Sequence, residues 1–119
     1  MANEKINKFS FHSKLEENYR IFQLDGNLIS DDDYKTLIDE LNKNTCWNLL
    51  FDLKRLSYIS SLGISFFVKS MTRARINGGE IMLINLNQKV KEVFTITKLD
   101  QVFSIAEDTR EAKKYFKNY

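Results

Sequence analysis

The segment that most constrains the fold is WNLLFDL at residues 47–53, a nearly continuous apolar run in the middle of the chain. The run is too short for a typical helix, and its successive apolar side chains would point to both faces of a strand. A strand that is apolar on both faces needs cover on both sides, as in parallel sheets layered with helices. The run therefore predicts a central strand in an α/β fold.

The residues before this run predict a hairpin and one helix. Apolar and polar residues alternate over 9–24 around a turn at 16–18, which is typical of two antiparallel strands. Ser30 stands three residues before Asp33, the spacing of a capping box at the start of a helix. Apolar residues at helical spacing then predict a helix that runs to about Asn44.

The residues after the central run predict further strands and helices. We expect helices that begin near Ser61, after Asn87 and at Asp108 or Thr109, and strands at 80–86 and 102–106. Strands that alternate with helices indicate parallel pairing with right-handed crossovers. The predicted fold class is α/β, with a mixed, partly parallel sheet of about five strands, an N-terminal hairpin and about four helices. These elements are expected to form one domain over residues 1–119.

Composition narrows the possible functions. The chain has 119 residues, of which 43% are hydrophobic, so one domain with a sizeable core is expected. A net charge of +2 gives no basis for nucleic-acid binding. The first residues lack the apolar core of a signal peptide, no run reaches about 18 apolar residues, and the single Cys46 cannot form an internal disulfide. We therefore expect a cytoplasmic protein without membrane insertion.

The stretch YISSLGISFF at residues 58–67 places two serines between the central strand and the next helix, at the edge where open α/β sheets usually carry their sites. Such a serine is most often a helix N-cap. A catalytic serine would need a glycine two residues before it and a nearby base. Ile59 occupies the glycine position before Ser61, and His12, on the opening hairpin, is the only histidine. The sequence therefore predicts no catalytic residue and no enzyme.

Neither a cofactor nor a metal is predicted. The chain has no phosphate-binding loop of the Walker type, because the glycine pair at 78–79 leads into a strand instead of a helix. Cys46 and His12 do not make a metal cluster. The acidic residues 31–33 are better explained as favourable charges in the first turn of a helix.

The helix that follows the serines carries apolar residues on two sides. At about 100° per residue, one side should pack on the sheet. That side consists of Ile64, Phe67, Val68, Met71 and Ala74. The opposite side consists of Leu62, Phe66, Lys69 and Arg73. An exposed leucine and phenylalanine beside two cations indicate a partner-binding patch, with cover by the N-terminal hairpin or simple surface scatter as the alternative.

Several successive segments resemble the STAS domain of bacterial anti-sigma-factor antagonists. They are LFDLKRLSYISSLGISFF, the glycine pair at 78–79, EIMLINL and KVKEVFTITKLDQVFSI, and the resemblance extends over nearly the whole chain. It implies a STAS-type fold without catalysis and without a bound cofactor. It also implies a protein partner, an anti-sigma factor that is itself a serine kinase and that supplies the ATP site.

In that family, phosphorylation of one loop serine breaks the complex with the anti-sigma factor. Alignment on Gly63 puts Ser61 at this position, with Ser60 as the alternative. Ser60 stands where the family usually has an aspartate, and Leu62 where a second serine or threonine usually precedes the glycine. The resemblance implies a regulator of transcription that phosphorylation of Ser61 switches off.

The expected partner-binding surface joins the two serines to the helix that follows them. It consists of Ser60, Ser61, Leu62, Gly63, Phe66, Lys69 and Arg73. A phosphoryl group on Ser61 would lie at a helix N-terminus, which favours anions. The chain is expected to be a monomer or a weak dimer. Three alternatives stay open. The first is a STAS subunit of a lipid-transport ATPase complex and the second is a scaffold in a larger signalling assembly, both without phosphoregulation. The third is an unrecognised enzyme.

Overall fold

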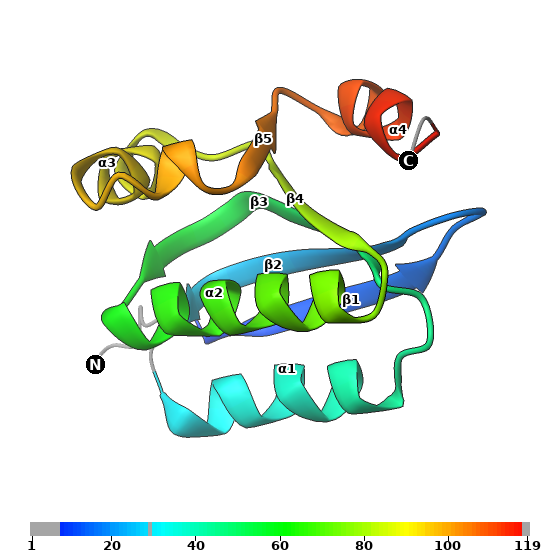
Figure 1. Cartoon of the computed structure of the whole chain (residues 1–119). Coiled ribbons are helices and arrows are strands. Elements are labelled where there is room, and N and C mark those ends of the chain that lie inside the picture. The colour runs from blue at the N-terminus through cyan, green and yellow to red at the C-terminus, as the bar shows by residue number, and fades with distance from the viewer. Residues whose placement is uncertain (1–7, 29, 118–119) are drawn as a thin grey trace, which may run out of the picture.

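The structure, a computed structural model, describes residues 8–28 and 30–117, which form a five-stranded sheet with helices on both faces (Figure 1). The strands lie in the order β1 (Ser10–Leu15), β2 (Arg20–Leu28), β3 (Asn48–Ile59), β4 (Glu80–Ile84) and β5 (Ser104–Ala106). β1 is antiparallel to β2, and the other neighbouring pairs are parallel. The apolar run lies in the central strand of a mixed sheet, and the predicted hairpin forms one edge.

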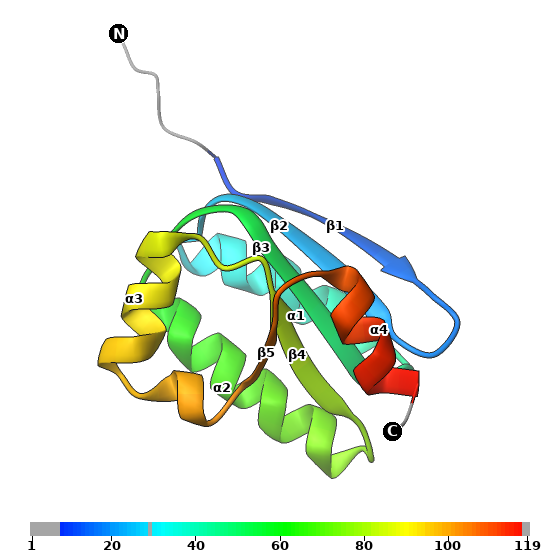
Figure 2. The same ribbon diagram turned by 90° about the horizontal axis from the view of Figure 1, so that it is seen from above.

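The helices are α1 (Asp31–Lys43), α2 (Ser61–Ile76), α3 (Gln88–Ile96) and α4 (Thr109–Lys117), with a short 3-10 helix, η1, at Leu99–Gln101. In Figure 1, α1 and α2 lie together beneath the sheet and α4 lies above it. Seen from above, α3 and α4 lie near opposite ends of the molecule, and α4 covers only part of its face of the sheet (Figure 2). The predicted fold class is confirmed.

The central strand β3 contributes to a core on each face of the sheet. Leu49, Phe51 and Leu53 belong to the core shared with α1, α2 and α3. Leu50 belongs to the second core, together with Phe116 of α4. All five side chains are almost completely buried, and burial of each contributes about 1.5–3 kcal/mol. The continuous apolar run is therefore explained by helices on both sides.

The helices begin at the predicted capping residues. The Ser30 hydroxyl accepts the Asp33 N–H at 3.2 Å, and the Asp33 carboxylate accepts the Ser30 N–H at 3.3 Å, which completes the capping box of α1. Asn87 and Asp108 each accept a backbone N–H from the first turn of the following helix at 3.0 Å. Local sequence chemistry therefore sets these three helix starts.

β3 extends further than the apolar run predicts, to Ile59 instead of Leu53. Beyond Leu53 the buried residues are Leu56 and Ile59, which are spaced three apart instead of two. Two register shifts in the pairing with β2 explain this spacing, because each adds one residue to β3 and disrupts the strict alternation. As a result, β3 stays paired with β2 up to Ile59, the residue before the two serines.

Candidate functional site

The two serines lie at the junction of β3 and α2, at the carboxyl edge of the central strand (Figure 1). Ser60 occupies the N-cap position with extended backbone angles, φ −91° and ψ 176°. Its side chain makes no capping hydrogen bond, which differs from the usual role of a serine at this position. Ser61 is the first residue of α2 and is exposed.

Tyr34 of α1 holds the side chain of Ser60. The Tyr34 hydroxyl lies 3.0 Å from the Leu28 carbonyl oxygen and 2.7 Å from the Ser60 hydroxyl oxygen. Because a carbonyl oxygen can only accept, Tyr34 donates to Leu28, and the Ser60 hydroxyl must donate to Tyr34. The half-buried Ser60 thus uses its proton within the fold.

The Tyr34 hydroxyl remains protonated at neutral pH, as this arrangement requires. Burial is the main cause that raises its pKa, and the negative charges of Asp33 and Asp31 raise the pKa further. The hydrogen bond from Ser60 acts in the opposite direction, because a donor stabilises the phenolate. The net direction of the pKa shift is upward, away from neutrality.

Gly63 allows the first turn of α2 to approach both β3 and Tyr34. A Cβ atom at this position would collide with the Ile59 side chain and would lie 3.0 Å from the Tyr34 hydroxyl. The absence of a side chain at Gly63 is therefore needed for packing, not for backbone freedom. This glycine helps to place α2 where Ser60 can reach Tyr34.

Ser61 is in a different environment from Ser60. Its exposed hydroxyl makes no hydrogen bond within the part of the chain that the structure describes. The first turn of α2 contains no acidic residue of its own, so no side chain of that turn offsets the positive end of the helix dipole. Such a helix N-terminus favours a bound or attached anion.

The predicted exposed side of α2 is wrong at Phe66. This side chain is only 6% exposed, and its ring centroid lies 6.3 Å from that of Tyr34 and 6.0 Å from that of Phe51. The cover comes from α1, which packs beside α2 on the same face of the sheet, and not from the N-terminal hairpin. Phe66 is a core residue, whereas Leu62 and Lys69 are exposed as predicted.

The predicted sheet-facing side of α2 also needs correction. Phe67, Met71 and Ala74 are buried as expected, but Ile64 and Val68 are only half-buried. The buried surface is rotated toward the flank with Phe66, because α2 must contact both the sheet and α1. A single apolar stripe aimed at the sheet is too simple a description of a helix with two neighbours.

Arg73 is engaged within the fold at the other end of α2. Its guanidinium lies 5.0 Å from the centroid of the Trp47 ring and donates a 2.9 Å hydrogen bond to the Asn42 side-chain oxygen. Twelve residues of helix place it about 18 Å along the axis from Ser61. Arg73 therefore links α2 to α1 and to the start of β3, far from the serines.

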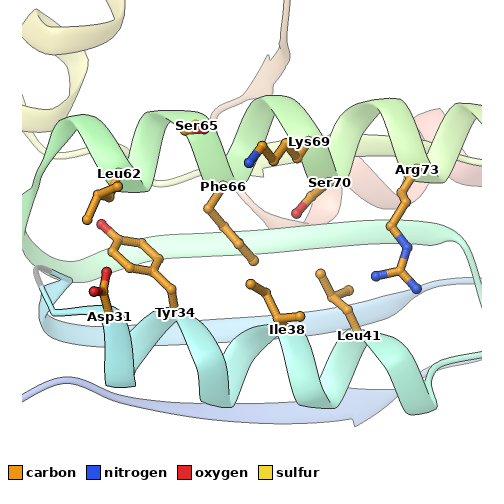
Figure 3. Close-up of a pocket in the computed structure, with 10 residues that line it drawn as sticks. All are labelled: Asp31, Tyr34, Ile38, Leu41, Leu62, Ser65, Phe66, Lys69, Ser70 and Arg73. Carbon is orange, nitrogen blue, oxygen red and sulfur yellow. The ribbon is translucent and has the colours of Figure 1, made fainter.

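Of the predicted site residues, the structure brings Ser60, Ser61, Leu62 and Gly63 together at the start of α2. Lys69 lies further along this helix, at the rim of a groove between α1 and α2 (Figure 3). Sequence reasoning did not assign Tyr34 to the site. The missing information was that α1 and α2 run next to each other, which no local pattern contains.

Residues 8–28 and 30–117 offer no metal site and no membrane span. That part of the chain contains no group of three or more histidine, cysteine, aspartate or glutamate residues arranged to hold a metal ion. None of its helices is both long and apolar enough to cross a bilayer. Cys46 is a free, half-buried thiol.

The fold and this junction define a class of small α/β domains that present a serine at a helix N-terminus beside the central strand. The chain belongs to the STAS domain family, whose model matches residues 12–112. BtrV of Bordetella bronchiseptica, whose name assigns it to the anti-sigma factor antagonists, is 35% identical over 69 residues. This match covers 58% of the chain and 60% of BtrV, so the chain spans about 60% of the length of this curated relative.

Solved structures with names of the same class share the fold. TM1081 of Thermotoga maritima, assigned as an anti-sigma factor antagonist, has a TM-score of 0.79 and 22% identity over 90% of this chain and 94% of its own. The antagonist SpoIIAA in its unphosphorylated form has a TM-score of 0.78 and 17% identity over 92% and 98%. SpoIIAA of Bacillus in its phosphorylated form has a TM-score of 0.70 and 17% identity over 89% and 98%.

Proposed function

We propose that this chain, as a single domain over residues 1–119, is a cytoplasmic anti-sigma-factor antagonist. It binds an anti-sigma factor through the surface around Ser60, Ser61 and Leu62, and thereby regulates transcription. Phosphorylation of Ser61 by the serine kinase activity of that partner ends the interaction. The observation that carries the proposal is the exposed, unengaged hydroxyl of Ser61 at a helix N-terminus, in a chain that belongs to the STAS family.

The choice of Ser61 over Ser60 rests on the hydrogen bonds at the junction. A kinase needs the serine hydroxyl as a nucleophile that can approach the γ-phosphate of ATP in line. The Ser60 hydroxyl donates to Tyr34 and points into the fold. Before Ser60 could enter a kinase active site, this 2.7 Å hydrogen bond would have to break. Ser61 needs no such rearrangement, because its hydroxyl is already exposed.

A phosphoryl group on Ser61 would act mainly on the partner and little on the fold. The N-terminus of α2 accommodates the charge, because its first-turn N–H groups and the helix dipole favour an anion. The neighbouring Leu62, which is 49% exposed, offers an apolar contact that a partner would bury. An added charge of about −1.5 to −2 in that contact introduces repulsion and a desolvation penalty. A loss of about 3 kcal/mol weakens a complex more than a hundredfold.

The chain supplies the acceptor serine and the docking surface, and the partner supplies the kinase chemistry and ATP. This division is supported by the absence of a phosphate-binding loop in the sequence. We propose no catalytic role, no cofactor and no nucleic acid for this domain, and we expect a monomer or a weak dimer in solution.

The decisive experiment is affinity capture of the full chain from its native host, followed by incubation of the captured kinase with ATP and by peptide mapping. Phosphate on Ser61 and loss of the partner from the phosphorylated chain would support the proposal. Ser61→Ala is expected to remove the modification, and Ser60→Ala serves as the matched control that keeps it. A stable complex that ignores both substitutions would indicate a scaffold or a transport-complex subunit and would refute the switch.

A further inference from the structure

The groove between α1 and α2 is a second candidate site, which shares Leu62 with the surface around Ser61 (Figure 3). Its volume is about 340 Å³, and both helices line it. Leu41 and Phe66 in its lining are buried, whereas Ile38 and Leu62 on opposite walls are 42% and 49% exposed. The groove is therefore an apolar trough that opens to solvent.

Hydrogen-bond donors gather toward one end of this groove. Lys69, Ser70 and Arg73 line it toward the C-terminus of α2, whereas Asp31 lies at the opposite end (Figure 3). Lys69 is exposed and forms no ion pair within residues 8–28 and 30–117. The groove thus has a positive end with free donor capacity and a negative end.

Ser70 contributes a polar group to the lining of the groove. The residue is only 2% exposed, and its hydroxyl forms no hydrogen bond among the residues that the structure describes. Figure 3 shows its oxygen directed into the groove, toward the gap between the two helices. The Ser70 oxygen is not fully enclosed by protein, so its hydroxyl can donate to an acceptor atom placed in the groove.

We infer that the groove binds a small amphiphile with a linear apolar chain and a terminal carboxylate. The chain lies between Ile38, Leu62 and Phe66, and the carboxylate accepts from Lys69 and Ser70. Asp31 disfavours the reverse orientation, because it would place two negative charges at the same end. This ligand site goes beyond the proposed function and does not depend on phosphorylation.

The dimensions favour a small ligand over a protein segment. A volume of about 340 Å³ lies at the lower end of the range for small-molecule sites, about 300–1,000 Å³. A stable protein interface buries about 800 Å² on each partner. The exposed surface of two aliphatic side chains, Ile38 and Leu62, is only a small part of that interface area. A protein partner that seats one side chain in the groove is therefore the competing outcome of the test.

The test is a nuclear magnetic resonance titration of the full chain with hexanoate, octanoate and decanoate below their micelle-forming concentrations. We expect saturable amide shifts confined to α1 and α2. Each added methylene is expected to lower Kd about fourfold until the groove is full. Octanol, which has the same chain length without the charge, is expected to bind at least about tenfold more weakly than octanoate.

Lys69→Gln is expected to abolish the preference for octanoate over octanol. Lys91→Gln, which changes an exposed lysine on α3, is the matched control and should leave both affinities unchanged. The spectra of both variants report whether the fold is intact. Any one of three results would overturn the inference. They are no saturable shifts with any of the three carboxylates, affinities that do not depend on chain length, and an unchanged preference for octanoate over octanol in Lys69→Gln. None of these results depends on a kinase, so they leave the proposed function untouched.

Discussion

Replacement of Tyr34 by phenylalanine tests the hydrogen bonds that distinguish the two serines. The ring is 7% exposed and packs against Phe66, so Tyr34→Phe keeps the packing and removes only the hydroxyl. That hydroxyl donates to the carbonyl of the fully buried Leu28 and accepts from Ser60. Loss of the donor to a buried carbonyl costs about 1–3 kcal/mol, and the bond to the half-buried Ser60 adds less.

The expected loss in the free energy of unfolding is therefore about 1–3 kcal/mol. Urea denaturation measures it, and with a slope of about 1–3 kcal/mol/M the midpoint should fall by roughly 1 M. Tyr58→Phe is the matched control, because this tyrosine is 51% exposed near the end of β3. Its substitution should change stability by less than about 0.5 kcal/mol.

The same variant has a second measurable effect, on the site of phosphorylation. With Tyr34 unable to accept its proton, Ser60 is free to rotate outward and to compete with Ser61 for the kinase. Peptide mapping of the phosphorylated chain should then find phosphate on both serines in Tyr34→Phe, and on Ser61 alone in the unsubstituted protein and in Tyr58→Phe. A destabilised Tyr34→Phe variant that is still modified only on Ser61 would refute the idea that Tyr34 determines the acceptor.

Three further predictions follow from the site and its supports. Phe66→Ala should destabilise the fold by about 3–5 kcal/mol in urea denaturation, as much as Phe67→Ala, because both rings are buried. Lys69→Ala, on the exposed side of the same helix, should have little effect. Ser61→Asp should keep the circular dichroism spectrum but weaken the partner complex by about tenfold or more in a binding titration, since it adds charge to the contact. Gly63→Ala should lower the free energy of unfolding by about 1–3 kcal/mol, because the added methyl group collides with Ile59. The double variant Gly63→Ala/Ile59→Ala should lose less than the sum of the two single losses, because removal of the Ile59 side chain relieves the collision.

The sequence predicted most of the fold because local chemistry determines most of its elements. The apolar run at 47–53 identified the central strand, and Ser30, Asn87 and Asp108 identified helix starts that the structure confirms. The extension of β3 to Ile59 was missed for a physical reason. Its buried residues depend on two register shifts against β2, and the position of such shifts is a property of the paired strands together.

The site was predicted only where it depends on residues close in sequence. The order of the apolar run and the helical pattern after it correctly placed the serines at the start of α2, since strand and helix follow one another there. Phe66 was assigned to solvent because a helical wheel shows one helix and omits its neighbour. Only the packing of α1 beside α2 reveals that this flank is buried, and that Arg73 is held by Asn42 at 2.9 Å.

The residue at position 60 fits the hydrogen-bond chain that runs from α2 through α1 to β2. Ser60 donates to Tyr34, and Tyr34 donates to the Leu28 carbonyl, so each group has a donor and an acceptor in the correct order. An aspartate at this position, as the family resemblance would suggest, is ionised at neutral pH and could only accept. It would compete with Leu28 for the single Tyr34 proton and leave one acceptor unpaired. Serine at position 60 and tyrosine at position 34 are therefore best understood as a matched pair, which leaves the neighbouring Ser61 as the serine with a free hydroxyl.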